Sequence, residues 1–239
     1  DATNAVRRAL EYCKANHVSK IIFPKGRYDF WLAHAAEKYI FTSNNDASLK
    51  RIVFLLENFN NFEIDGQGSS FIFHGYISPF IIAHSENIFL HNFTIDWERT
   101  FSSEGKIISV QDSSILLSFS KEYPYIIQNG QLVFTDEDKN EYPYDNLVEF
   151  DPVKNETAFM AVDHYLNGNV AATEISPGTV SINLPDIKVT TGNVMVFSAP
   201  KRLCSGITAS DSRNLNCDSI TIYHCGGRGI LAHRYKNID

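Results

Sequence analysis

A short frame built around asparagine recurs in this sequence and constrains the fold more than any other feature. In each copy, an asparagine precedes an apolar residue, and a second apolar residue stands seven positions earlier in a strand-like stretch. The asparagines are Asn61, Asn87, Asn214 and Asn237, and the earlier apolar residues are Phe54, Phe80, Ile207 and Ile230. Short strands and turns that repeat every ~20–30 residues are typical of a parallel β-helix.

The spacing of the copies predicts an interruption of this β-helix. Asn61 and Asn87 are 26 residues apart and Asn214 and Asn237 are 23 apart, but 127 residues separate Asn87 from Asn214. The excess over one coil is about 100 residues, which predicts a separate inserted module, because insertions in solenoids emerge from individual coils. Asparagine suits the repeated turn because it tolerates the left-handed conformation and can bond to the asparagine of the next coil.

Two other segments complete the predicted architecture. Between the repeats, alternating strand-like runs are separated by Asn-Gly and Pro-Gly turns, which is typical of an antiparallel sheet. At the start, apolar residues at helical spacing predict a helix that covers the end of the solenoid. We therefore expect an all-β chain, with an N-terminal capping helix and the first β-helix coils in 1–98, an inserted antiparallel β-barrel or sandwich module in 99–200, and the resumed β-helix in 201–239.

The sequence stops as a new coil begins, so we expect further coils after residue 239 and interpret the chain as an N-terminal fragment. If it were complete, its uncovered solenoid end would favour self-association, and we would expect a homo-oligomer.

Composition excludes several classes of protein. The net charge of −7 leaves no excess of Lys and Arg for a phosphate backbone, so we expect no nucleic-acid partner. No apolar run approaches the roughly 18 residues of a membrane-spanning helix. The eight histidines form neither HxH nor HExxH, so we expect no metal site, and no pattern suggests a cofactor.

Three segments in order resemble a known family. They are IDGQGSSFIF, then NFTIDWERTFSSEGKI, and, after the predicted insert, SITIYHCGGRGILAHRYKNID. Together they resemble the exo-α-1,3-galactosidases of glycoside hydrolase family 110. The opening helix followed by IIFPKGRYDF also resembles the start of many carbohydrate-active right-handed β-helices. The resemblance covers essentially the whole chain and implies a right-handed β-helix with a small inserted β-barrel.

The same resemblance implies a function. Family members are inverting exo-glycosidases that remove terminal α-1,3-linked galactose from a glycan, which would be the partner of this chain. Inversion needs a carboxylic acid and a carboxylate about 6.5–9.5 Å apart. The family's catalytic aspartates, including an Asp-Asp pair, follow the barrel, and this sequence contains no Asp-Asp pair. We therefore expect the catalytic aspartates beyond residue 239, so that the chain alone need not be active, and a secreted or periplasmic location in a bacterium.

Within the chain, Asp96 and Glu98 are the weak candidates for catalysis. As residues i and i+2 of a strand they point to one face, and a carboxylate pair there suits acid–base chemistry or sugar binding. An ordinary charged surface is the alternative. Trp97 between them could stack on a sugar or pack in the core. Glu104, where the insert begins, is a substrate-binding candidate that could instead pair with Arg99.

Three more candidates for substrate binding surround a glycine-rich turn. In Gly226-Gly227-Arg228-Gly229, the glycines permit positive φ and close backbone approach. Arg228 could hold a sugar hydroxyl or orient a carboxylate, and His224 and His233 flank the turn. The alternative is a tight corner between coils with solvated side chains.

Two other functions remain open. One is a pectinase-like or polysaccharide-lyase-like β-helix enzyme, which would want Ca²⁺-binding acids and a basic residue. The acidic net charge disfavours the anionic substrate of such an enzyme. The other is a non-catalytic glycan-binding solenoid. The residues after 239 would distinguish these functions.

Overall fold

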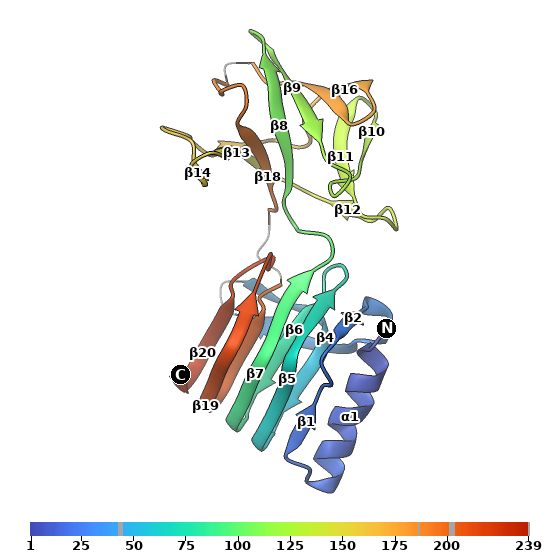
Figure 1. The fold of residues 1–239 in the computed structure, drawn as a ribbon, viewed down its shortest axis with the longest axis vertical. Coiled ribbons are helices and arrows are strands. Elements are labelled where there is room, and N and C mark those ends of the chain that lie inside the picture. The colour runs from blue at the N-terminus through green and yellow to red at the C-terminus, as the bar shows by residue number, and fades with distance from the viewer. Residues whose placement is uncertain (43–44, 186, 201–203, 239) are drawn as a thin grey trace. The chain divides into compact units, whose positions relative to one another are not determined.

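In the computed structural model the chain forms two compact units (Figure 1). Unit 1 consists of Asp1–Glu98 and Lys201–Asp239, and unit 2 of Arg99–Pro200. The structure describes residues 1–42, 45–185, 187–200 and 204–238. Among these residues most of the secondary structure is β, and no helix is both long and apolar enough to span a membrane.

Unit 1 combines one α-helix, one short 3-10 helix (Leu32–His34) and a β-sheet. The α-helix is α1 (Thr3–Asn16), which buries Val6, Leu10 and Cys13 on one face. The strands are β1 (Lys20–Ile22), β2 (Arg27–Phe30), β3 (Ala36–Thr42), β4 (Asn45–Glu57), β5 (Asn60–Phe73), β6 (Ser78–Ala83), β7 (Glu86–Trp97), β19 (Ile207–Ile222) and β20 (Ile230–Ile238). Apolar residues at helical spacing therefore produce the predicted N-terminal helix.

Parallel pairing dominates the sheet of unit 1, but the sheet is mixed. Strand β19 pairs in parallel with β6 near its start, with β7 along the rest of its length, and with β20 on its other side. Strands β5 and β7, and β4 and β6, are parallel pairs too. In contrast, β3 and β4 pair antiparallel. The predicted all-β fold is confirmed, but the sheet of unit 1 is mixed and not that of a parallel β-helix throughout, because the consecutive strands β3 and β4 pair antiparallel.

The asparagine frame is confirmed as a row of equivalent positions. Its members are Asn61, Asn87, Asn214 and Asn237. All four have a left-handed φ of 53–62°, and each side-chain amide after the first donates to the side-chain oxygen of the one before it, at 2.8–2.9 Å. Seven residues earlier, Phe54 pairs with Phe80, Phe80 with Ile207, and Ile207 with Ile230. Strands separated by unit 2 in sequence are therefore neighbours in register.

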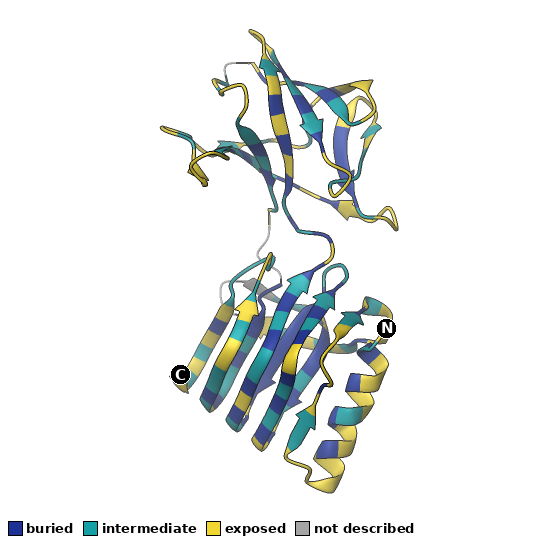
Figure 2. Cartoon of the chain, viewed as in Figure 1, coloured by how far each residue is buried: buried dark blue, intermediate teal, exposed yellow. Residues whose placement is uncertain are grey.

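Stacked aromatic rings lie in the core of unit 1, whose buried residues are dark blue in Figure 2. The rings of Phe54 and Phe80 lie 4.2 Å apart with planes 7° apart, and those of Phe71 and Phe93 lie 4.9 Å apart at 20°. Phe54 and Phe80 are register partners on parallel strands, which lie ~4.8 Å apart, so their rings can meet face to face. Phe71 pairs in register with Ile95, so its stacking on Phe93 reaches beyond the register partner.

Unit 2 is built from short antiparallel strands. They are β8 (Ser103–Val110), β9 (Ser114–Phe119), β10 (Tyr125–Gln128), β11 (Gln131–Thr135), β12 (Glu141–Tyr142), β13 (Asn146–Asp151), β14 (Glu156–Thr157), β15 (His164–Tyr165), β16 (Ala172–Ser176), β17 (Thr179–Asn183) and β18 (Val194–Ser198). Eight form one sheet and β10, β11 and β12 form another. The core contains Phe134 and Phe197, whose rings meet edge to face at 5.0 Å.

Candidate functional site

Neighbouring parallel strands of unit 1 end side by side (Figure 1), and polar residues lie at or next to these ends. The pairs Phe30 with Phe73 and Phe73 with Trp97 align the ends of β2, β5 and β7. We call the polar residues at these ends the strand-end cluster: Arg27, Asp29, His74, Asp96, Glu98 and His224. Side-chain alternation explains their exposure, because Ile95 and Trp97 are buried while the residues next to them point outward.

Asp96 contacts His224, which follows the neighbouring strand β19. The Oδ1 atom of Asp96 lies 2.8 Å from Nδ1 of His224 and accepts a hydrogen bond from the backbone N–H of Trp97, also at 2.8 Å. His224 has a left-handed φ of 45° and a side chain that is 55% exposed. A carboxylate on one ring nitrogen fixes the orientation of an imidazole. The Nε2 atom of His224 is then the ring nitrogen left to meet a ligand.

Glu98 belongs to a second chain of contacts within the cluster. The Nη2 atom of Arg27 lies 2.6 Å from Oε2 of Glu98 and 2.7 Å from Oδ1 of Asp29. Asp29 also contacts Nε2 of His74 at 2.9 Å, and the His74 ring stacks on Trp31 with centroids 3.6 Å apart. Hydrogen bonds from Arg27, and then from His74, lower the pKa of Asp29. The carboxylate of Asp29 is therefore ionised at neutral pH.

The two catalytic candidates share a face but not a partner. Asp96 and Glu98 both point outward, as the alternation predicts, yet Asp96 binds a residue that follows β19 and Glu98 binds a residue of β2. Trp97 is only 3% exposed and packs against Phe73 at 5.6 Å, so its ring is not presented for stacking on a sugar.

The exposed aromatic rings near the cluster are those of Trp31, 39% exposed, and Tyr223, 51% exposed. Neither ring was a sequence candidate. Their position in the sequence could have identified them, because Trp31 directly follows β2 and Tyr223 directly follows β19.

The other sequence candidates make different contacts within their own units. Glu104 is in β8 of unit 2 and accepts a hydrogen bond from the Tyr123 hydroxyl at 3.0 Å. Arg99 lies over the Tyr123 ring, 5.1 Å from its centroid. His233 pairs with Ser210 near the start of β19, whereas His224 follows the end of that strand. His233, in β20, therefore lies beside the start of β19, and His224 lies just beyond its end.

The glycine-rich turn serves close backbone packing. The carbonyl of Arg228 accepts a hydrogen bond from the N–H of Gly206 at 3.0 Å, and its own N–H donates to Ser205 Oγ at 3.3 Å. A Cβ on Gly206 would lie 2.9 Å from the carbonyl oxygen of Gly229, so only glycine fits there. These contacts involve the backbone of Arg228 and leave its guanidinium as a candidate for ligand binding.

Two groups of side chains have the ligand atoms that a metal ion would need. Among the described residues these groups are Asp29 with His74 and Glu98, and Glu63 with Asp65 and His91. A cationic side chain already pairs with each group. Arg27 pairs with the first group, and Lys20 lies 2.8 Å from Glu63 in the second. A metal would have to replace these ion pairs. The sequence rules missed both groups because their members come from separate strands rather than from one local motif.

Comparisons with known proteins relate this chain to galactosidases. Residues 103–195 match the family described as GLAA-B beta-barrel domain I. The chain is 35% identical to Alpha-1,3-galactosidase A of Shewanella woodyi, over 97% of this chain and 39% of that protein. It is also 35% identical to Alpha-1,3-galactosidase B of Bacteroides thetaiotaomicron, over 100% of this chain and 40% of that protein. The chain spans about two fifths of the length of these curated relatives.

Proposed function

We propose that this chain is part of an exo-acting α-galactosidase of the glycoside hydrolase family 110 type. The observation that carries the proposal is the 35% identity to two proteins named alpha-1,3-galactosidase, because the similarity extends over nearly the whole chain. The substrate is then a glycan with terminal α-1,3-linked galactose, and the protein acts outside the cytoplasm of a bacterium, secreted or in the periplasm.

The proposal includes the fold of unit 1, a right-handed parallel β-helix that continues in the whole protein. The asparagine ladder supports stacked coils, and so does a second row of left-handed residues, His84, Asp211 and Arg234, which follow aligned strand positions. The hairpin of β3 and β4 is then a local addition to the coils. The part of the relatives that this chain does not span gives the length for further coils.

The proposed reaction proceeds with inversion at the anomeric carbon. One carboxylic acid protonates the departing oxygen while a carboxylate activates water about 6.5–9.5 Å away. We assign these two groups to aspartates outside the 239 residues described here. The coils of this chain then contribute to recognition of the sugar rather than to bond cleavage.

The strand-end cluster has the chemistry that this recognition needs. The carboxylates of Asp96 and Glu98 can accept hydrogen bonds from sugar hydroxyls, and a charged partner makes such bonds stronger. The exposed rings of Trp31 and Tyr223 can take the C–H face of a pyranose. We therefore assign substrate binding to this cluster and, within it, to Asp96 with His224.

The test is release of galactose from an α-1,3-linked digalactoside by the full-length gene product and by this chain. We expect the full-length protein to release galactose, with the β-anomer as the first product in the proton NMR spectrum. The 239-residue chain should not release it. An α-anomer would contradict inversion, and activity of the short chain would contradict the assignment of the catalytic pair. Failure of the full-length protein to act on α-galactosides would contradict the proposed function.

A further inference from the structure

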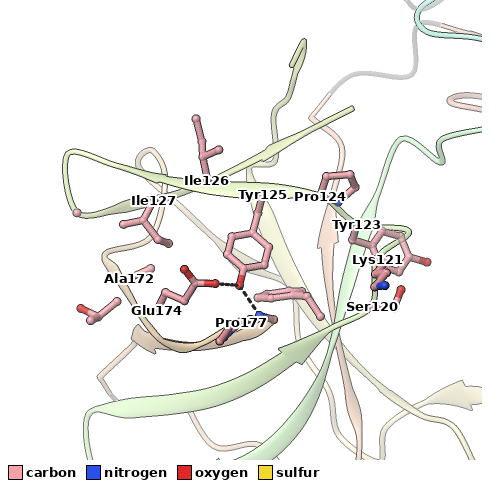
Figure 3. Close-up of a pocket in the computed structure, with 14 residues that line it drawn as sticks. Ser120, Lys121, Tyr123, Pro124, Tyr125, Ile126, Ile127, Ala172, Glu174 and Pro177 are labelled. Carbon is pink, nitrogen blue, oxygen red and sulfur yellow. Dashed lines mark hydrogen bonds between the residues drawn. The ribbon is translucent and has the colours of Figure 1, made fainter. Parts of the chain in front are cut away.

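A hollow of about 850 Å³ opens on unit 2 between two strands that lie at the ends of their sheets (Figure 3). Strand β10 is the end of the three-stranded sheet, and β16 is one end of the larger sheet. The two sheets are joined close by, where the N–H of Ala172 donates to the carbonyl of Gly130 at 2.8 Å. Pockets of about 300–1,000 Å³ are typical for small ligands, so the hollow has room for one or two sugar rings.

The lining combines an apolar wall with few charged groups. Figure 3 shows Tyr125, Ile127 and Pro177 around the hollow, with Glu174 between them. Among the described residues that line it, Lys121 is the one positively charged residue. Flat apolar surface with a small number of placed polar groups is the usual composition of a site for a small molecule.

Glu174 is held in place by Tyr125. The Tyr125 hydroxyl donates to Oε1 of Glu174 at 2.7 Å and accepts a hydrogen bond from the N–H of Gly178 at 3.1 Å. Burial, together with Glu174, raises the pKa of Tyr125 to about 12, so the hydroxyl remains a donor at neutral pH. Among the hydrogen bonds described for this chain, Oε2 of Glu174 has no partner, so this oxygen is the acceptor that the hollow offers to a ligand.

We propose that this hollow binds a neutral sugar unit of a glycan, with Glu174 accepting hydrogen bonds from sugar hydroxyls and the wall around Tyr125 covering an apolar C–H face. A carboxylate in the middle of the lining favours hydroxyl donors and repels uronic acids. The inference rests on the proposed function for the identity of the glycan, an α-galactoside. A second, weak glycan site raises the effective concentration of a branched substrate at the protein.

The test is a titration of the ¹⁵N-labelled chain with galactose-α-1,3-galactose, followed by the amide signals of Gly130, Thr173 and Gly178. We expect these signals to shift in a saturable way. The variant Glu174→Gln keeps an oxygen acceptor for Tyr125 but removes the charge, and it should weaken binding about tenfold. The matched variant Glu156→Gln alters an exposed carboxylate of unit 2 outside this lining and should leave the affinity unchanged.

Several outcomes would overturn the inference. Absence of shifts at the hollow, equal affinity of Glu174→Gln and the unchanged chain, or tighter binding of trigalacturonic acid would each contradict it. Shifts confined to signals of the strand-end cluster would also contradict it while leaving the proposed function intact. Conversely, saturable shifts at the hollow with no galactose release by the full-length protein would support a sugar site and contradict the galactosidase.

Discussion

A column of stacked aromatic rings runs through the core of unit 1 beside edge-to-face pairs, whereas in the core of unit 2 the rings of Phe134 and Tyr144 meet that of Phe197 edge to face. In unit 1, Phe54 and Phe80 stack with planes 7° apart, and Phe80 and Phe93 with planes 12° apart. In unit 2, Phe134 meets Phe197 at 66°, and Tyr144 meets Phe197 at 85°. Phe54 and Phe80 are register partners on parallel strands, so their rings can stack, whereas Phe134 and Phe197 come from different sheets and meet at an angle.

The two units differ in the interactions that fix the register of their strands. In unit 1, asparagines at equivalent positions of neighbouring strands bond to one another, so each strand depends on the strand beside it. In unit 2, each antiparallel strand pair depends on its own turn and on the core that the strands share. A substitution in the asparagine row of unit 1 should therefore affect the neighbouring strands, while a substitution in a turn of unit 2 should act locally.

The largest effect is expected from truncating a stacked ring. Phe80 is fully buried between Phe54 and Phe93, so Phe80→Ala should lower the free energy of unfolding by about 3–5 kcal/mol. Urea unfolding followed by tryptophan fluorescence measures this in unit 1, because the two tryptophans, Trp31 and Trp97, both lie there.

The matched variant in unit 2 is Phe197→Ala, which removes an equally buried ring. It should cost a similar ~3–5 kcal/mol, detected by hydrogen exchange in peptides of residues 99–200. A loss below ~1 kcal/mol for Phe80→Ala would mean that the stacked column does not hold unit 1 together.

A smaller effect is expected in the asparagine ladder. Asn87→Ala removes the hydrogen bonds to Asn61 and from Asn214 and places alanine at a φ of 55°, which should cost about 2–3 kcal/mol. Asn129→Ala has the same backbone conformation, φ 53°, in the turn between β10 and β11, and should cost only ~1 kcal/mol. Equal losses in urea unfolding would contradict a cooperative ladder.

The units should also respond differently to pH. The carboxyl groups whose pKa is lowered among the described residues all lie in unit 1, and they include Asp29, held by Arg27 and His74, and Glu63, held by Lys20 and His91. A lowered folded-state pKa gives stability that is present above the unfolded value of about 4 and is lost as pH falls through the folded value. Unit 1 should therefore weaken below pH ~4, measured by urea unfolding with tryptophan fluorescence.

Two variants sharpen this pH comparison. Asp29→Asn should flatten the loss of stability in acid, while Asp112→Asn at an exposed turn of unit 2 should not. In unit 2, burial raises the pKa of Tyr144 to about 12. The stability that the protonated hydroxyl gives to unit 2 is therefore present below the unfolded pKa of about 10 and is lost as pH rises from that value through the folded pKa. Acid instability that Asp29→Asn leaves unchanged would show that other groups control it.

The smallest effect is expected at an exposed apolar segment of unit 2. Phe159 is 91% exposed and Met160 is 81% exposed, so their side chains bury little surface within this chain. Phe159→Ser should change the free energy of unfolding by less than ~0.5 kcal/mol. Thermal unfolding of the variant measures this, and a loss comparable to that of Phe197→Ala would show that the segment is packed in solution.

The sequence predicted local repetition well and long-range polar pairing poorly. The asparagine frame predicted which strands are neighbours, because the asparagine and the apolar residue seven positions earlier recur together in each copy. Strand alternation made Asp96 and Glu98 a candidate pair, and the glycine-rich turn made His224 a separate candidate. The sequence did not predict that Arg27 meets Glu98, 71 residues away, or that His224 meets Asp96, 128 residues away. Such pairs carry no local signal, since they depend on the register between strands and on the direction of each side chain.

In unit 2 the alternation of apolar residues predicted antiparallel strands, and these are found. The hollow beside Tyr125 and Glu174 was not predicted. It depends on how the ends of two separate sheets meet, which is a property of the whole unit and not of any one strand.

The central claim is that the strand-end cluster of unit 1 binds the terminal α-galactoside. The most direct measurement is kcat/KM for galactose release by the full-length gene product carrying Asp96→Asn, beside Asp218→Asn at an exposed position of β19. We predict a loss of about tenfold or more for Asp96→Asn and no change for Asp218→Asn. Equal activity of Asp96→Asn and the unchanged protein would contradict the claim.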